Sequence, residues 1–314
     1  MDTIKFSDIT NKTTEQHNLT ISKTVPVEIC GKTHIMYSPC NLNIFVSNSC
    51  HNYCNFCINR HQPEKLSTEQ FLNGLEKMLG DLSGTPIEAT ITGGEPTINP
   101  ERFVETLSIL HKHNIPCRTV STTGYQLLYE YKGYPLAKYL IDNGYIHNIS
   151  ISRMSFDEKQ NDVLMSGQNI SNQELERLLT FFKLNGAEAR ISCNLLPNGV
   201  NSLDLMLQFL RDQNQIGADS VMFRQIEGNF PKIDIKPIFE ELKNNELFTY
   251  VETLNGMFYY VDIFEYTDII THKTFLVKCY HTVIPTEKDI ISSMTFNHGA
   301  LRDGFSGPIL ADYT

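Results

Sequence analysis

The segment 49–57 reads Ser-Cys-His-Asn-Tyr-Cys-Asn-Phe-Cys and follows the apolar run 42–46. Its cysteines, Cys50, Cys54 and Cys57, have the spacing C-x3-C-x2-C. Three thiols this close cannot all pair as disulfides, but their thiolates can converge on one metal centre. When three cysteines bind a four-iron cluster, the fourth iron has no protein ligand and is open to chemistry. The spacing therefore predicts a metal centre in this loop.

A structural zinc site is the alternative for the same cysteines. His51 or His61 would supply the fourth ligand of a tetrahedral zinc ion. Zinc modules usually present two ligand pairs separated by a longer loop, and the chain holds no second C-x2-C. The spacing favours the iron cluster and leaves zinc open.

A glycine-rich turn follows the next predicted strand. Residues 87–91 read as a buried strand and lead into Thr92-Gly93-Gly94-Glu95-Pro96. Two glycines let the backbone approach a ligand closely and adopt angles that other residues avoid. Glu95 then adds a carboxylate, and Pro96 stiffens the exit. A lone triplet of this kind is usually an ordinary turn, but its position one strand and one helix after the cysteine loop makes the pair of motifs specific.

Together the two motifs resemble the signature of the radical S-adenosylmethionine (radical SAM) enzymes, including the aromatic Phe56 before the last cysteine. The resemblance implies that Cys50, Cys54 and Cys57 hold a [4Fe–4S] cluster. The open iron of that cluster would chelate the amino and carboxylate groups of S-adenosylmethionine (SAM). One electron from the cluster would cleave SAM into methionine and a 5′-deoxyadenosyl radical, which abstracts hydrogen from the substrate.

By the same resemblance, Gly93, Gly94 and Glu95 bind the amino group of SAM, within a Gly-Gly-Glu-Pro motif that Pro96 completes. The cofactor would then lie at the end of the strand predicted at residues 87–91. The pair of motifs weakens the zinc interpretation, under which the chain would be a zinc-stabilised binding module without enzymatic activity.

Strands and helices alternate along most of the chain. Apolar residues recur at helical spacing in segments 71–82, 103–110, 136–141, 175–182 and 203–210. The strand-like runs are 42–46, 87–91, 116–121, 147–152, 189–195 and 220–224. Six alternations favour a parallel sheet with right-handed crossovers, and the resemblance implies an α/β fold with a partial (β/α)6 barrel open on one side. Both motifs lie at carboxyl ends of strands, where chemistry gathers in parallel barrels.

The segments before and after these six units do not alternate strand and helix. Residues 26–37 predict an N-terminal β-hairpin about a turn at Gly31 and Lys32. Beyond about residue 231, strand-like runs at 257–264, 274–280 and 290–296 predict a C-terminal β-rich extension, expected to close the barrel mouth or line the substrate pocket. The expected division is an N-terminal β extension at residues 1–40, the barrel at 41–230 and a capping region at 231–314.

Polar residues end two further predicted strands. Residues 121–124, Ser-Thr-Thr-Gly, resemble the Thr-Asn-Gly turn of the branch that contains the molybdenum-cofactor cyclase and viperin-like proteins, with Thr123 in place of Asn. Ser121 and Thr123 are therefore candidate SAM contacts, or simply part of a good turn. By the same resemblance, Ser152 would contact the ribose hydroxyls. Arg153 replaces an acidic residue, and its forked guanidinium suits the SAM carboxylate; a solvated charge is the alternative.

Cys193 and Asn194 end the fifth predicted strand, and alternation means that one of them faces the barrel lumen. Asn194 resembles the adenosine-contacting position of that strand, with Asn201 as a second candidate. A lumenal Cys193 would be a hydrogen-atom donor to a substrate radical, as in radical epimerases. The alternative is a small buried hydrophobe, the usual state of a lone strand cysteine.

The composition bounds the compartment and the partners. The chain has 314 residues, of which 41% are hydrophobic and 20% are charged, as in a globular protein with a proper core. No apolar run approaches the length of a membrane span, and the first residues lack a signal-peptide stretch. We therefore expect a cytoplasmic protein with no membrane partner, whose thiols stay reduced and available to iron. The formal net charge of −10 disfavours nucleic acid as the main partner.

Two substrate classes stay open for a radical SAM enzyme with these features. The first is a small metabolite or nucleotide, modified in an oxidoreductase or transferase reaction of a biosynthetic pathway. The second is a peptide, as in ribosomal peptide maturation or epimerisation, with Cys193 as hydrogen donor. The compact C-terminal region, which lacks a cysteine-rich tail of the auxiliary-cluster type, favours the metabolite and a single cluster. The resemblance also implies an electron donor such as flavodoxin or ferredoxin.

Overall fold

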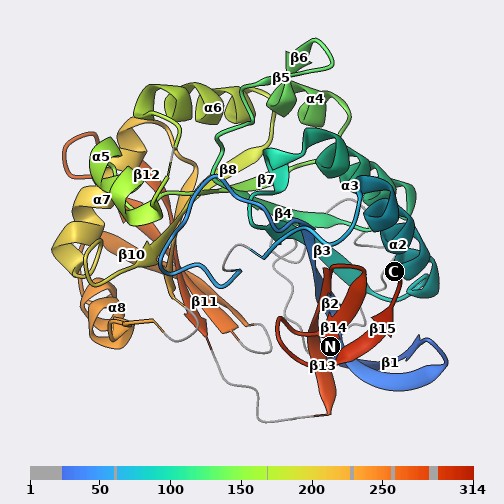
Figure 1. The fold of residues 1–314 in the computed structure, drawn as a ribbon. Helices are drawn as coiled ribbons and strands as arrows, with labels where there is room; N and C mark the ends of the chain where they lie inside the picture. Colours follow the sequence, from blue (N-terminus) through green and yellow to red (C-terminus); the bar gives the residue numbers. More distant parts are fainter. Residues whose placement is uncertain (1–22, 60–61, 168, 227–229, 256–258, 283–288) are drawn as a thin grey trace.

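The computed structural model describes residues 23–59, 62–167, 169–226, 230–255, 259–282 and 289–314 (Figure 1). Within these ranges, one 13-stranded sheet has the order β10-β11-β12-β9-β8-β7-β4-β3-β2-β13-β14-β15, with β1 paired to β2. Its strands are β1 (Lys23–Ile29), β2 (Lys32–Ser47), β3 (Ile87–Gly93), β4 (Cys117–Thr122), β7 (Asn148–Ser152), β8 (Glu188–Leu195), β9 (Ser220–Gln225), β10 (Phe248–Asn255), β11 (Tyr259–Thr267), β12 (Thr274–Thr282), β13 (Ile290–Asn297), β14 (Ala300–Asp303) and β15 (Ile309–Asp312).

The helices connect these strands. They are α2 (Thr68–Asp81), the 3-10 turn η2 (Pro96–Ile98), α3 (Pro100–Lys112), α4 (Leu136–Asp142), α5 (Glu158–Met165), α6 (Asn172–Leu184), α7 (Leu203–Gln215) and α8 (Ile235–Lys243). A small separate hairpin, β5 (Glu130–Tyr131) and β6 (Tyr134–Pro135), precedes α4. Ser171 caps α6 in a reciprocal pair with Glu174, which is the Ser-x-x-Glu spacing of a capping box.

Six parallel strands form the centre of the sheet, in the order β2-β3-β4-β7-β8-β9. They coincide with the six strands predicted from the sequence, and the predicted helices lie between them along the chain. Figure 1 shows these helices on the outer side of the curved sheet. The predicted partial (β/α)6 barrel is confirmed.

The predicted N-terminal hairpin is also present. β1 and β2 are antiparallel, with Ile29 opposite Lys32 across a turn in which Cys30 and Gly31 have positive φ. β2 then continues as the first strand of the barrel, so hairpin and barrel share one strand and residue 40 lies inside it.

The C-terminal strands extend both edges of the six-stranded centre. β12 lies parallel beside β9, and β11 and β10 follow it antiparallel. At the opposite edge, β13 lies parallel beside β2, and β14 and β15 follow. The predicted second hairpin is confirmed as β11 and β12, although its first residues, 257 and 258, lie outside the described residues. These strands lie in line with the sheet and not across its mouth, because β2 and β9 would otherwise present unpaired edges.

One helix interrupts the region that the sequence predicts to be β-rich. In α8 the buried residues Ile235, Ile238, Phe239 and Leu242 lie on one face, and Asp234 caps the helix by accepting from the N–H of Lys236. This is the i, i+3, i+4, i+7 spacing of an amphipathic helix, so the signal was present in the sequence.

Side chains alternate between an apolar outer face and a polar inner face of the barrel. On β8, Ala189, Ile191, Cys193 and Leu195 belong to the main hydrophobic core against the helices. The residues between them, including Ser192 and Asn194, therefore point into the lumen. The same alternation on β7 and β9 gives the barrel a polar interior. No helix in the described ranges is both long and apolar enough to cross a membrane.

Candidate active site

The cysteine loop leaves the end of β2 and crosses the mouth of the barrel to the opposite wall (Figure 1). There, the N–H of Tyr53 donates to the carbonyl of Ser166 at 3.0 Å, and Cys54 Sγ donates to the carbonyl of Met165 at 3.1 Å. Cys54 and Phe56 pack against a second apolar cluster from α5 and the ends of β7, β8 and β9. The loop is thus held at both sides of the mouth.

The three thiols lie close enough to influence one another's charge. Burial, together with the neighbouring Cys57 and Cys50, raises the pKa of Cys54 to about 12. Burial also raises the pKa of Cys50 to about 11, with Glu95 and Cys57 adding to the effect. Three thiolates in such a place need a cationic centre to be stable, so metal binding and deprotonation are coupled here.

Three cysteines are the protein ligands of a four-iron cluster that leaves one iron open. Across the described part of the chain, no three His, Cys, Asp or Glu side chains gather tightly enough around one point to hold a metal ion. A four-iron cluster presents its irons at separate corners, so its thiolates are farther apart. His51 places Nε2 3.2 Å from Thr123 Oγ1 and its ring 4.8 Å from Tyr125, and His61 lies outside the described residues. His51 is therefore turned toward Thr123 and Tyr125.

The Gly93-Gly94 turn is fastened to the start of the cysteine loop. The N–H of Gly94 donates to Ser47 O at 2.7 Å, and the N–H of Glu95 donates to Ser49 O at 2.8 Å. Gly93 has a φ of +140°, and a Cβ there would lie 2.2 Å from Ser47 O. A Cβ on Gly94 would lie 2.3 Å from Ser49 O. The glycines are required for this backbone contact, which fixes the two motifs relative to each other.

Glu95 lies at the centre of a hydrogen-bond network at the ends of β3 and β4. It is 0% exposed, and Oε1 accepts from Thr97 N at 3.1 Å, Thr97 Oγ1 at 2.6 Å and Thr122 Oγ1 at 2.6 Å. Oε2 accepts from Thr123 N at 2.7 Å. Oε2 keeps capacity for a further donor, since a carboxylate oxygen has about two lone-pair sites. The neighbouring Pro96 is buried and begins η2.

The remaining predicted site residues lie on two different faces of the strands, one toward the lumen and one toward the helices. Ser121 pairs in register with Ser150, and Ser152 pairs with Ser192, all at polar positions of the inner face. Asn194 is level with Arg224 of β9. Ser152 and Asn194 thus lie near the carboxyl ends of β7 and β8, the end of the barrel at which the two motifs also lie.

Arg153 and Cys193 point the other way. Arg153 is 1% exposed; its guanidinium donates to Ile170 O at 2.7 Å and to Asn172 Oδ1, which ties the end of β7 to the start of α6. Cys193 is 0% exposed, lies in the main apolar core, and donates weakly to Asn194 O at 3.6 Å. Burial raises the pKa of its thiol far above the ordinary range. Both positions fit structural roles, since each is one residue out of phase with the lumenal face.

Glu64 and Arg102 hold the two ends of the cysteine loop, and sequence reasoning missed both. Glu64 accepts from the backbone of Asn48 and Ser49 and pairs with Arg102 at 3.0 Å. Arg102 also donates to the carbonyls on both sides of the loop, Val46 at 3.2 Å and Leu66 at 2.9 Å. Although burial opposes ionisation, hydrogen bonds from Ser47, Asn48 and Ser49 hold the pKa of Glu64 below its usual range. Neither residue stands in a motif, so only the fold brings them together.

A second missed contact lies where the loop meets the segment after α5. The side chain of Asn52 donates to Asn169 Oδ1 at 2.9 Å, and a Cβ on Gly167 would lie 2.1 Å from Asn52 Oδ1. Gly167 therefore leaves room for the loop to dock. Neither this contact nor the helix α5 that precedes Gly167 was predicted from the sequence.

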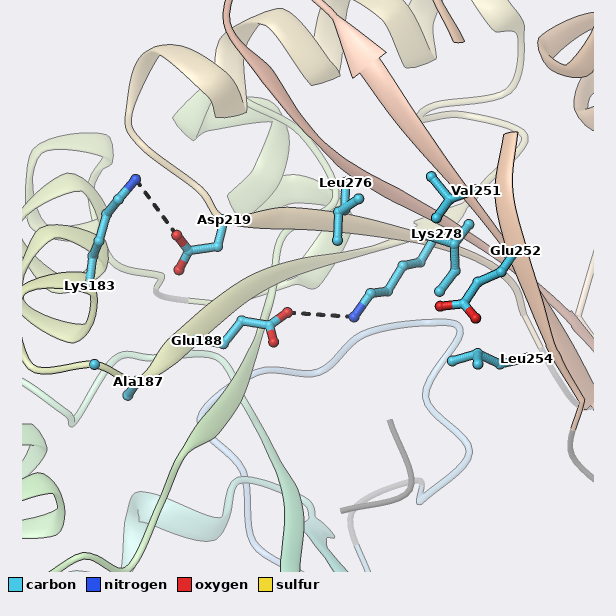
Figure 2. A pocket seen from close by; sticks show the side chains of 11 residues that line it. Lys183, Ala187, Glu188, Asp219, Val251, Glu252, Leu254, Leu276 and Lys278 are labelled. Carbon is cyan, nitrogen blue, oxygen red and sulfur yellow. Dashed lines mark hydrogen bonds and ion pairs between the residues drawn. The ribbon is translucent and has the colours of Figure 1, made fainter. Parts of the chain in front are cut away.

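A cleft lies away from these residues, at the amino ends of the strands (Figure 2). It has a volume of about 480 Å³ and is lined by Glu188, Asp219, Lys278 and apolar residues of β10 to β12. Figure 2 shows Lys278 directed at Glu188, 3.5 Å away, and Lys183 directed at Asp219, 3.8 Å away. Because Glu188 is the first residue of β8, this cleft lies at the opposite end of the strands from the cysteine loop.

Comparison with known proteins supplies the family. The family described as the radical SAM superfamily matches residues 44–211, which is more than half of the chain. No curated protein matches the chain. Streptococcus suis SuiB bound to its precursor peptide SuiA is 21% identical over 66% of this chain and 46% of its own, with a TM-score of 0.50.

Two further solved structures are similar to the chain. Native anSMEcpe with bound AdoMet and Cp18Cys peptide is 18% identical over 60% of this chain and 52% of its own, with a TM-score of 0.46. Methylornithine synthase (PylB) is 20% identical over 60% of this chain and 54% of its own, with a TM-score of 0.42. The chain spans about half the length of these structures. From the family match, the chain belongs to the radical SAM superfamily and is an enzyme whose cofactors are SAM and a [4Fe–4S] cluster.

Proposed function

We propose that Cys50, Cys54 and Cys57 hold the [4Fe–4S] cluster at the mouth of the barrel and that SAM binds beside it, against the Gly93-Gly94 turn. The observation that carries this proposal is the direct backbone bonding between that turn and the cysteine loop at 2.7 Å and 2.8 Å. Two motifs held together so rigidly keep the cofactor and the cluster in one geometry, as reactions that depend on precise placement require.

Different residues would bind different parts of SAM. Glu95 offers a carboxylate oxygen toward the ammonium group of SAM, while its other bonds hold the ends of β3 and β4. Ser152 and Asn194 face the lumen, where the ribose and adenine would lie, with Ser121 and Thr123 at the neighbouring strand end. When bound, the cluster supplies the electron that cleaves SAM into methionine and a 5′-deoxyadenosyl radical, which takes a hydrogen atom from the substrate. The apolar contacts of Cys54 and Phe56 help to exclude water from this place.

The polar lumen supports a small polar substrate, a metabolite or a nucleotide, in a barrel spanning residues 41–230. The C-terminal residues 231–314 would contribute to the substrate-facing wall through β12. The Ser121-to-Gly124 turn and Ser152 support a place in the branch of the molybdenum-cofactor cyclase and viperin-like proteins. All eight cysteines of the chain are free, which fits a reducing compartment such as the cytoplasm, with flavodoxin or ferredoxin as electron donor.

A peptide substrate is the second candidate, and one comparison favours it. SuiB, which shares the fold, is named as bound to a precursor peptide. Fractionated cell extract added to the reduced, cluster-loaded enzyme would separate the two: the small-molecule fraction should stimulate 5′-deoxyadenosine formation if the substrate is a metabolite, and the peptide fraction if it is a peptide.

The cluster assignment is tested by anaerobic reconstitution of wild type, Cys54→Ala and the control Cys30→Ser, an exposed cysteine in the β1–β2 turn. Wild type and control should bind about four irons per chain and form 5′-deoxyadenosine from SAM with dithionite, and Cys54→Ala should lose nearly all of both. About eight irons, half of them kept when all three loop cysteines are Ala, would reveal a second cluster. One zinc without iron uptake would support a zinc-stabilised binding module.

A further inference from the structure

One arginine of the lumen lies opposite the two motifs, on the far strands of the barrel. Val221 and Phe223 of β9 belong to the apolar core, and the ring of Phe223 lies 5.9 Å from that of Phe209 on α7. Arg224, the next residue, therefore points into the lumen. It lies next to the last position of β9, close to the carboxyl ends of the parallel strands, where the mouth is.

Arg224 forms a row with its neighbours on both sides. In the parallel register it is level with Asn194 of β8 and with Tyr280 of β12. Its guanidinium carbon lies 4.5 Å from the centre of the Tyr280 ring. An arginine stacked on an aromatic ring is held in a fixed plane while the N–H groups at its edge stay available to a planar or tetrahedral anion.

The charge of Arg224 has no acidic partner within ion-pair distance among the described residues, in a chain whose formal net charge is −10. Lys278, two residues before Tyr280 on β12, behaves differently. Lys278 pairs with Glu188 at 3.5 Å, as Figure 2 shows, and is thereby neutralised. A half-buried arginine without an acidic partner among the described residues, at the mouth of a polar lumen, is suited to an anionic group that arrives with a ligand.

The positions of Arg224 and Tyr280 along the chain indicate which ligand these two residues meet. The family match ends at residue 211, so β9 and β12 both lie beyond it. SAM and the cluster are common to the family and are bound in the shared part, whereas residues outside that part meet what differs between members. Tyr280 comes from the C-terminal region, which adds its own strand to the barrel edge.

We propose that Arg224, held on Tyr280 and flanked by Asn194, binds an oxyanion group of the substrate, a carboxylate or a phosphate, and so anchors it opposite SAM. This inference rests on the proposed function. The guanidinium would bind two oxygens of the anion in parallel, which fixes the orientation of the substrate as well as its position.

The test uses the cluster-loaded enzyme with SAM bound, titrated anaerobically with two probes, inorganic pyrophosphate and glutarate. At least one probe should bind saturably to wild type and at least about tenfold more weakly to Arg224→Met, since a charge-assisted contact is lost. Arg224→Lys, which keeps the charge but not the fork, should fall between them. Arg177→Met, which removes an exposed arginine on α6, should bind like wild type. Tighter binding of pyrophosphate assigns the site to a phosphate, and tighter binding of glutarate to a carboxylate.

Three results would overturn the proposal: no saturable binding of either probe, equal binding to wild type and both Arg224 variants, or a loss confined to SAM affinity. The last would assign Arg224 to the cofactor. Iron content and 5′-deoxyadenosine formation, measured on the same samples, keep the two proposals apart, because failure of the proposed function removes both from the wild type as well.

Discussion

At the mouth of the barrel, Glu95 is buried and the two motifs are joined by backbone hydrogen bonds, whereas the cleft at the amino ends of the strands is open and lined by ion pairs. Glu95 at the mouth has four donors within 3.1 Å, while Glu188 at the cleft has Ser220 Oγ at 3.3 Å and Lys278 at 3.5 Å. The difference teaches that a site built to hold a reactive cofactor is found by its close hydrogen-bond network, and not by the volume of its opening.

A pair of glycine variants gives the largest contrast between the two ends. Gly93→Ala should lower the free energy of unfolding by about 3 kcal/mol and reduce iron uptake, because its Cβ would lie 2.2 Å from Ser47 O at a φ of +140°. Gly186, which lines the cleft, also has a positive φ but open space around it. Gly186→Ala should cost about 1 kcal/mol and keep the iron. Urea unfolding and iron analysis measure both, and equal effects would break the contrast.

Substitution of Glu95 at the mouth and of Glu188 at the cleft compares the two ends of the barrel by their effect on SAM affinity. Glu95→Gln should keep the cluster spectrum and weaken SAM binding by about 1.5–3 kcal/mol, because a charged acceptor becomes a neutral amide that also meets the donors of Thr122 and Thr123. Glu188→Gln, at the other end of the barrel, should leave SAM affinity as it is. Calorimetric titration of SAM provides the measurement. Unchanged affinity in Glu95→Gln would leave Glu95 as a residue that only holds the two strand ends.

Cys193 separates the hydrogen-donor hypothesis from the packing role that its position favours. In the packing role, Cys193→Ala lowers the free energy of unfolding by about 1 kcal/mol and keeps full turnover. A hydrogen donor would behave differently: 5′-deoxyadenosine would still form, product would fall, and wild type would place one solvent deuterium in the product. We expect the first result, since the thiol lies in the apolar core on the helix side of β8.

The smallest effect concerns the pH dependence of the cysteine-loop anchor. The folded pKa of Glu64 is lowered by hydrogen bonds from Ser47, Asn48 and Ser49, so its ionised form stabilises the fold above the unfolded pKa of about 4.3. That contribution is lost as the pH falls through the lower folded pKa. Unfolding by urea at a series of acidic pH values should therefore show a shallower loss of stability in Glu64→Gln than in wild type. Parallel curves for the two proteins would contradict the assignment.

The local patterns of the sequence were enough for the fold and for the two motifs. The six central strands were predicted from short strand-like runs, and five of the helices from apolar residues at a 3.6-residue period, so both predictions depend on neighbours in the chain. The three cysteines and the Gly93-Gly94 turn are likewise contiguous, and the end of a parallel strand is a predictable place. The reading of residues 231–314 as β-rich missed α8, although its apolar spacing was there to be found.

By itself, the sequence determined the alternation of the six central strands with helices, the cluster-type spacing of the cysteines and the family resemblance, because those depend on residues near one another in the chain. Tertiary structure alone decided which residues of a strand face the lumen, since a shift of one residue turns Arg153 and Cys193 away from it. It alone also joined Glu64 to Arg102, Asn52 to Gly167 and Arg224 to Tyr280. These contacts connect positions far apart in sequence, and no local pattern encodes the packing that brings them together.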